Sequence, residues 1–385
     1  MENIQSKSKN ILIISSVFPP YNKWWGQSQV AYDYAKWLRN NWFNISVLTH
    51  QFWWLSKTET IESIKITRFQ NYFQFLFNIW LYNPKKYIDC LRNHIREFDL
   101  VFIHDIYTLY WFLSAFFAKK NNIPYIFMPH WMWSLKNQTE KVFFKKIFIV
   151  LFSNFISNNA KKVIFCSQNE KDNYSLKYRD YEIVTNGIKK DIWLENLATI
   201  SEENKTEFRK RYQIENKKVI FSMWRLVKAK RFDLLIQYIK NFLTKNPDYL
   251  LLIVWPDWWE KENIQNIIIK ENLINNIKII DWLYNKEKYT LFKIWELFIL
   301  ASDIEGFPIV VCEAIISNIP CLLSKWCNIE EKWWYIEIFI NELDFNKKLS
   351  LLLQNKTKIG FKKIYNDFDF SISLKKLLKI IKNII

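Results

Sequence analysis

Short apolar runs alternate with amphipathic, helix-like segments along most of the chain. Runs such as ILII (11–14) and LLIV (251–254) are bounded by polar or turn residues and are too short for buried helices, so they predict buried strands. Strands that alternate with helices are typical of α/β domains with parallel sheets. The expected strands lie near 10–16, 44–49, 100–104, 124–128, 162–166 and 182–185, and then near 217–223, 249–255, 276–281, 297–302 and 320–325.

The strands form two series, which are separated by Asn186-Gly187 and a long charged stretch. A chain of 385 residues usually forms two domains, each with its own core. We therefore expect two Rossmann-like domains that face a cleft, one over 1–190 and the other over 206–365. Residues 366–385 predict an amphipathic, basic helix, which is a candidate for packing back on the N-terminal domain.

Composition argues against several classes of protein. No window has 18 uninterrupted apolar residues, so no membrane-spanning helix is expected. The polar N-terminus leads straight into the first strand, unlike a signal peptide. The five cysteines are scattered without a C-x-x-C pair, which is typical of reduced core thiols rather than of disulfides or a zinc site. These features favour a cytoplasmic protein.

The net charge of +17 indicates an anionic partner. Nucleic acid is not expected, because no helix-turn-helix, finger or RNA-binding signature accompanies the charge. An anionic membrane surface and a phosphorylated substrate remain. The basic, apolar segment 141–162 is interpreted as a packed core helix, with peripheral docking on a membrane as the alternative.

Tryptophan stands where turns call for glycine. The sequence has 4 Gly and 20 Trp, whereas glycine averages about 7% of residues. Trp24 and Trp25 lie in the turn after the first strand, where a phosphate-binding backbone would bend sharply, and Trp42 lies at a helix C′ position that favours the left-handed conformation. We favour the hypothesis that UGA codons for glycine are read here as tryptophan; the alternative is a chain that binds sugars or membranes through exposed indoles. Three tryptophans have contexts that tolerate a real indole: Trp80, Trp111 and Trp193.

The strongest chemical motif is EGFPIVVCE, residues 305–313, which follows an expected strand. The segment from Ile309 to Ile316 predicts a helix, and its N-terminal amides suit a phosphate group. Glu313 lies about one turn into this helix and can accept hydrogen bonds from ribose hydroxyls. Spacing alone does not distinguish Glu305 and Glu313 from two unrelated surface carboxylates.

A second motif, SMWRLVKAKRFD, follows the first strand of the second series. Its Arg225 and Lys230 are five residues apart in a turn and suit a diphosphate, because arginine binds in bidentate fashion and lysine acts as a point charge. A solvated basic loop is the alternative. We favour binding, because this loop and the glutamate motif follow strands of one sheet.

Together these motifs resemble those of the retaining, nucleotide-sugar-dependent glycosyltransferases of family 4, which have the GT-B fold. The resemblance runs from about residue 10 to residue 325, in the family's order. It includes the first turn and helix (18–49), PHWMWSLK (129–136), FCSQNEKDNY (165–174), VTNGI (184–188), SMWRLVKAKRFDLLI (222–236), IVWPDWW (253–259) and the closing Glu-x7-Glu segment (279–320). Six tryptophans stand where the family has glycine: Trp24, Trp25, Trp131, Trp224, Trp255 and Trp282.

The resemblance implies that 1–190 is an acceptor-side domain and 206–365 a nucleotide-sugar-binding domain. It also implies a role for each matched residue. Arg225 and Lys230 would hold the donor diphosphate and neutralise the leaving group, so no metal or other cofactor is expected. Glu313 would bind the donor ribose, and His130 would lie by the reacting sugar. Glu305 would position the transferred sugar together with the amides of Gly306, Phe307 and Pro308. The catalytic candidates are therefore His130, Glu305, Arg225 and Lys230. The remaining substrate-binding candidates are Gly306, Phe307 and Pro308, the turn of Trp24, Trp25 and Gly26 at the acceptor or donor phosphate, and Asn186.

The implied activity is hexosyl transfer from a UDP- or GDP-sugar to a glycan or lipid-linked acceptor, with retention of configuration, at the inner face of the plasma membrane. Such a reaction belongs to polysaccharide or cell-envelope synthesis. A nucleotide-sugar epimerase and a non-catalytic GT-B protein that binds carbohydrate or membrane are the alternatives. Asp367-Phe368-Asp369 matches a D-x-D metal motif, but its place beside the C-terminal helix favours a solvated helix start.

Overall fold

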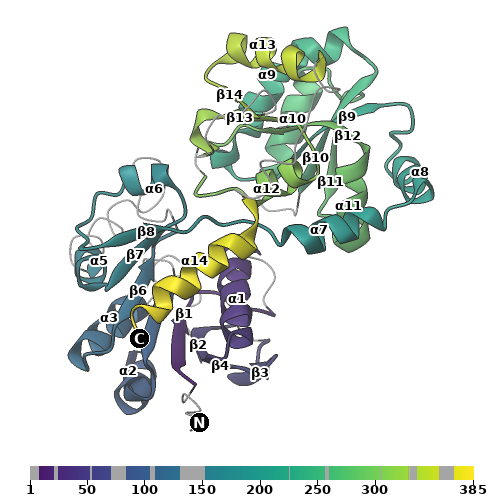
Figure 1. Ribbon diagram of the computed structural model, residues 1–385. Coiled ribbons are helices and arrows are strands. Elements are labelled where there is room, and N and C mark those ends of the chain that lie inside the picture. Colours follow the sequence, from purple (N-terminus) through teal and green to yellow (C-terminus); the bar gives the residue numbers. More distant parts are fainter. Residues whose placement is uncertain are drawn as a thin grey trace. The chain divides into compact units, whose positions relative to one another are not determined.

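In the computed structural model, which describes most of the chain, the protein forms two compact units (Figure 1). The first unit comprises Met1–Thr185 and Ser373–Ile385, and the second comprises Asn186–Ile372. The described residues are 8–20, 25–52, 54–70, 84–104, 109–130, 152–224, 226–255, 260–303, 305–327, 329, 336–354 and 368–385.

The first unit is built on a sheet in the order β3-β4-β2-β1-β5-β6-β7-β8. Only β3 runs antiparallel to its neighbour. The strands are β1 (Asn10–Ile14), β2 (Asn44–Gln51), β3 (Thr58–Ile61), β4 (Ile64–Gln70), β5 (Leu100–His104), β6 (Tyr125–Met128), β7 (Lys162–Phe165) and β8 (Tyr181–Ile183). The helices are α1 (Trp25–Asn40), α2 (Pro84–His94), α3 (Leu109–Lys120), α5 (Asn154–Asn159), α6 (Gln168–Asp172) and α14 (Phe370–Lys382), with a 3-10 turn, η2 (Ile95–Glu97).

The second unit has a parallel sheet in the order β11-β10-β9-β12-β13-β14. Its central strands are buried because both faces carry helices, with one apolar cluster on each side. The strands are β9 (Lys218–Met223), β10 (Tyr249–Trp255), β11 (Ile277–Asp281), β12 (Trp295–Leu300), β13 (Cys321–Ser324) and β14 (Ile336–Phe339). The helices are α7 (Lys190–Ala198), α8 (Glu202–Arg211), α9 (Phe232–Lys245), α10 (Lys261–Lys270), α11 (Asn285–Ile294), α12 (Ile309–Ile316) and α13 (Glu342–Gln354), with the 3-10 turns η4 (Lys228–Lys230) and η5 (Lys325–Cys327).

The expected α/β fold with two parallel-sheet units is confirmed, and each expected strand is present within about two residues. Strands β3, β4 and β14 were missed. The β3-β4 hairpin turns at Glu62 and Ser63, whose φ angles of 46° and 63° lie in the left-handed region without a glycine to signal the turn. The helix expected over 141–162 lies mostly outside the described residues, and its predicted end is wrong, because α5 ends at Asn159 and β7 begins at Lys162.

The C-terminal helix α14 contacts the strand end that closes the first unit (Figure 1). Lys376 Nζ donates to the Ile183 carbonyl at 2.8 Å and pairs with Glu182 at 3.1 Å. Gly187 lies against the backbone of residues 368–370. A Cβ there would come within 2.5 Å of the Phe368 carbonyl oxygen. No side chain fits at that position. The acceptor-side and nucleotide-binding roles of the two domains stay predictions.

Within the described parts of the chain, no helix has the length and apolar character needed to cross a bilayer. All five cysteines are free, and all but Cys90 are buried.

Candidate functional site at the ends of β9 and β12

The strand order of the second sheet reverses between β9 and β12, which pair in parallel. Ligands of open α/β sheets bind at such a reversal, outside the carboxyl ends of the strands. Two segments leave the sheet at this point: the basic loop (residues 224–231) after β9 and the glutamate loop (residues 301–308) after β12. Both were singled out from the sequence, and the sheet brings them together.

A buried ion pair joins the two loops. Lys230 Nζ lies 2.7 Å from Glu305 Oε1, and the two side chains are only 8% and 4% exposed. Ser302 Oγ donates to the same carboxylate oxygen at 2.7 Å, and the Lys230 ammonium lies 4.9 Å from the centre of the Trp224 ring. Ser302 carries no motif signal in the sequence and was missed. The pair places a cation and an oriented carboxylate where the strand order reverses.

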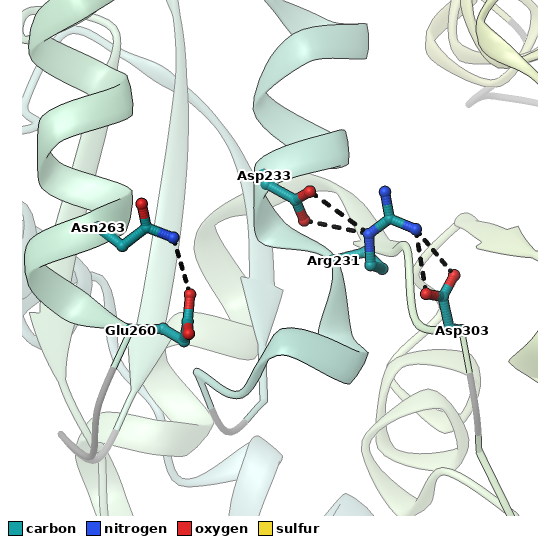
Figure 2. A network of polar contacts seen from close by, with 5 residues as sticks. All are labelled: Arg231, Asp233, Glu260, Asn263 and Asp303. Carbon is teal, nitrogen blue, oxygen red and sulfur yellow. Dashed lines mark hydrogen bonds and ion pairs between the residues drawn. The ribbon is translucent and has the colours of Figure 1, made fainter. Parts of the chain in front are cut away.

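Arg231 makes a second connection between these loops, as Figure 2 shows. Its guanidinium contacts Asp233 at 3.2 Å and Asp303 at 3.0 Å. The Asp303 N–H also donates to the Ala229 carbonyl at 2.9 Å. Arg231 adopts a left-handed φ of 49° at the start of α9, which is strained for a side chain of this size. The charge of Arg231 is thus compensated by aspartates, and its role here is to hold the basic loop against the glutamate loop. Arg225 lies outside the described residues.

Glu313 lies on α12, which has the bounds expected from the sequence. Pro308 is the N-cap of α12, and its side chain makes no cap hydrogen bond. Glu313 Oε1 accepts a hydrogen bond from Lys288 Nζ of α11 at 2.6 Å. Burial raises the pKa of Glu313, and the charge and hydrogen bond of Lys288 oppose that rise. Sequence reasoning missed Lys288, because nothing in its helix distinguishes it from a surface lysine.

Other groups around the glutamate loop are neutral or enclosed. Burial, together with the Glu305 carboxylate, raises the pKa of the Cys327 thiol to about 12, which argues against a thiolate nucleophile there. Gly306, Phe307 and Pro308 connect Glu305 to α12.

Asn186 is buried, and its Oδ1 accepts no hydrogen bond from the described residues.

His130 belongs to the first unit, at the end of β6, and has a left-handed φ of 50°. Its Nε2 lies 3.0 Å from Nδ1 of His104, which ends the neighbouring strand β5. Burial lowers the pKa of His130 to about 4 and also lowers that of His104, so both rings are neutral near pH 7. His104 was missed, although a polar residue at the carboxyl end of a predicted parallel strand is a usable signal. Trp24 lies outside the described residues, whereas Trp25 and Gly26 begin α1.

The described tryptophans differ in how well they fit their surroundings. Trp42 adopts the expected left-handed conformation, with φ of 72°, and its side chain is 87% exposed. Trp193, by contrast, donates its indole N–H to Ser317 Oγ at 2.8 Å. Buried indole N–H groups usually find a partner. Among the described residues, three have none: Trp224, Trp255 and Trp295.

No set of side chains in the described ranges could hold a metal ion. Asp367 of the D-x-D match lies outside those ranges. Asp369 Oδ1 accepts a hydrogen bond from the Ser371 N–H at 2.9 Å, which is the contact of a helix start.

Two parallel-sheet units with loops of this kind define a GT-B-type α/β protein. A model of "Glycosyltransferase Family 4" matches residues 24–191, and a model of "Glycosyl transferases group 1" matches residues 204–332. The chain belongs to this retaining glycosyltransferase family.

Two relatives agree with this assignment, and solved structures share the fold. An uncharacterized glycosyltransferase, MJ1059 of Methanocaldococcus jannaschii, is 26% identical over 303 residues, which are 75% of this chain and 70% of that protein. An uncharacterized glycosyltransferase of Haemophilus influenzae is 22% identical over 72% of this chain and 78% of its own length. The fold is shared with sucrose-phosphate synthase of Thermosynechococcus elongatus (TM-score 0.75, 13% identity, 97% and 98% of the two chains). It is also shared with Anabaena HepE in complex with UDP and glucose (TM-score 0.71, 14% identity, 97% and 100%).

Proposed function

We propose that this glycosyltransferase transfers a hexose from a UDP- or GDP-sugar to a glycan or lipid-linked acceptor. The observation that carries the proposal is the buried Lys230–Glu305 pair at the ends of β9 and β12, beside a helix whose N-cap residue, Pro308, makes no side-chain cap hydrogen bond. A diphosphate needs fixed positive charge and free amides, and this edge of the sheet offers both kinds of group.

Lys230 acts on the leaving group. Negative charge develops on the nucleoside diphosphate as its bond to the sugar breaks, and a cation already fixed in place stabilises that charge without reorganisation. Glu305 holds the ammonium at 2.7 Å, so the lysine needs no ordering when the donor binds. Arg225 and the first amides of α12 are proposed to share the phosphate charge.

Glu313 and His130 are proposed to recognise the two ends of the donor. The Glu313 carboxylate accepts hydrogen bonds from ribose hydroxyls, and Glu305 with Gly306, Phe307 and Pro308 positions the sugar. His130 lies by the reacting sugar, where a neutral imidazole serves as a hydrogen-bond donor or acceptor without adding charge. Crystal structures of HepE contain UDP-glucose, which supports a UDP-sugar as the donor of this chain.

The acceptor is proposed to be anionic and to lie at the inner face of the plasma membrane, in the synthesis of a cell-envelope polysaccharide. The net charge of +17 favours such a surface. Helix α14 contributes to it, because Lys375, Lys379 and Lys382 are exposed on it. A lipid-linked diphosphate is negatively charged and would be attracted to this basic surface.

A donor and acceptor screen tests the proposal. The purified protein is incubated with UDP- and GDP-hexoses, with and without a lipid extract, and release of nucleoside diphosphate is followed. We expect release with one nucleotide that depends on the acceptor, and a product with the anomeric configuration of the donor. Conversion of the donor without any acceptor would indicate an epimerase, and no release with any donor would indicate a binding protein.

A further inference from the structure

We propose that Lys288 is a positioning residue for donor recognition: it holds one carboxylate oxygen of Glu313 and leaves the other to accept a hydrogen bond from the nucleotide ribose. The inference rests on the proposed role of Glu313. It adds a lysine from α11 to which the family resemblance assigns no role.

The contact between Lys288 and Glu313 is short and largely shielded from water. Lys288 Nζ lies 2.6 Å from Glu313 Oε1, and the side chains are 20% and 9% exposed. Among the residues that the structure describes, none donates a hydrogen bond to Glu313 Oε2. An ionised carboxylate can accept several hydrogen bonds, so this oxygen can take a hydroxyl while Oε1 stays with the lysine.

Lys288 is itself held in place by an aromatic residue of a third helix. Its ammonium lies 5.2 Å from the centre of the Trp193 ring, on α7. The Trp193 indole N–H donates to Ser317 Oγ, and Ser317 is the C-cap residue of α12, the helix that carries Glu313. The contacts therefore form a closed circuit through α7, α11 and α12. Such a circuit fixes the direction of the Glu313 side chain before a ligand arrives, which reduces the ordering that binding requires.

The charge of Lys288 also decides whether Glu313 can act as an acceptor. Burial favours the neutral acid, which would offer a proton where the ribose hydroxyl needs a lone pair. The other titratable groups near Glu313 in the described chain are Tyr289 and Cys312, whose pKa values are also raised by burial, so both are uncharged near neutral pH. Helix α7 and strand β13 also pack against α12, and none of their described charged groups shifts the pKa of Glu313. Lys288 is thus the group in the described chain that opposes the rise in the Glu313 pKa.

The test is a pH series of donor KM for Lys288→Met, which keeps most of the length of the side chain and removes the charge. We expect the donor KM to rise at least about tenfold at pH 7 and to recover as the pH is raised, because the pKa of Glu313 moves upward and ionisation requires a higher pH. At saturating donor, kcat should change by less than about threefold, since the lysine does not act on the reacting bond. Lys288→Arg should restore most of the affinity.

The matched control is Lys293→Met, which removes the same charge from an exposed position on the same helix and should leave donor KM unchanged. A wild-type KM and pH profile in Lys288→Met would overturn the inference. If that variant does not fold, titration of the Glu313 carboxyl carbon by NMR in the wild-type protein decides. A carboxylate ionised at pH 7 supports the inference, and a protonated acid contradicts it.

Glu313→Gln separates this inference from the proposed function. A raised donor KM in Glu313→Gln with no effect in Lys288→Met would remove only the role of Lys288. No effect in Glu313→Gln would remove the proposed role of Glu313 itself.

Discussion

The Lys230 ammonium and the Glu305 carboxylate lie 2.7 Å apart and are both buried. Each charge compensates the other in a low-dielectric environment. Removing only one of them would leave the other charge buried without that compensation and would lower stability. Activity and stability are therefore coupled at this pair. A variant that tests activity separately from stability must therefore remove both charges together.

Lys230→Met should lower the rate of sugar transfer at least about 100-fold, because the leaving diphosphate loses its fixed cation. It should also lower the free energy of unfolding by about 3 to 5 kcal/mol, since Glu305 is left buried without its partner. Lys230→Met with Glu305→Gln should recover most of that stability and none of the activity. Steady-state kinetics and urea unfolding measure the two effects.

The matched control for this series is Lys228→Met, an exposed lysine on the same loop, which should leave both quantities near their wild-type values. Near-normal turnover in the double variant would show that the buried pair is structural only.

Trp42→Gly should stabilise the protein by about 1 kcal/mol. The residue has a φ of 72° and is 87% exposed, so glycine relieves left-handed strain while little buried indole surface is lost. The measurement is the urea midpoint, with Asn122→Gly as control, because asparagine tolerates its left-handed φ of 56° far better. A loss of stability in Trp42→Gly, or an equal gain in both variants, would contradict the strain argument.

Mild acid should destabilise the first unit. Burial lowers the pKa of His50 to about 3 and that of His130 to about 4, and it also lowers that of His104. The histidines of the unfolded chain bind protons near pH 6.5, and those of the folded chain do not. Their contribution to the free energy of unfolding is therefore fully present above that pH and is lost as the pH falls toward about 4. Each histidine contributes a slope of about 1.4 kcal/mol per pH unit. Urea unfolding at pH 7 and pH 5 checks this, and equal stabilities at the two values would contradict it.

The sequence predicted the elements that are strongly apolar or carry motif residues. Helix α12 was placed at Ile309–Ile316, and the buried strands were found because each contains a short, mainly apolar run. The hairpin of β3 and β4 was missed because its first strand is largely exposed and its turn uses Glu62 and Ser63. An edge hairpin of this kind contains neither a continuous apolar run nor a glycine at its turn, which are the signals that marked the other strands and turns.

The candidate site could be predicted only where one chain segment contains the chemistry. Lys230, Glu305 and Glu313 lie in two short motifs, and the parallel pairing of β9 and β12 brings those motifs together. Lys288 lies 25 positions before its partner Glu313. That contact depends on how two helices pack, and a single sequence does not encode it in any spacing rule.

The hypothesis that UGA glycine codons are read as tryptophan remains to be tested, and the described tryptophans define where to look. We propose that the protein from its native source contains glycine at positions 42, 224 and 255. Trp42 is in a left-handed conformation. Trp224 and Trp255 stand where the family has glycine, and their indoles lack hydrogen-bond partners among the described residues. Trp193 should remain tryptophan, because its indole N–H is bonded to Ser317. Tandem mass spectrometry of these peptides decides, and tryptophan at all four positions would refute the hypothesis.

The central claim is that the donor nucleotide binds the second unit where β9 and β12 end. Calorimetric titration of UDP and of GDP into the wild-type protein, Glu313→Gln and the Lys230→Met/Glu305→Gln double variant tests it most directly. We predict saturable binding of one of the two nucleotides by the wild-type protein, weakened at least about tenfold in both variants. Absence of binding by the wild-type protein, or equal affinity in all three, would contradict the claim.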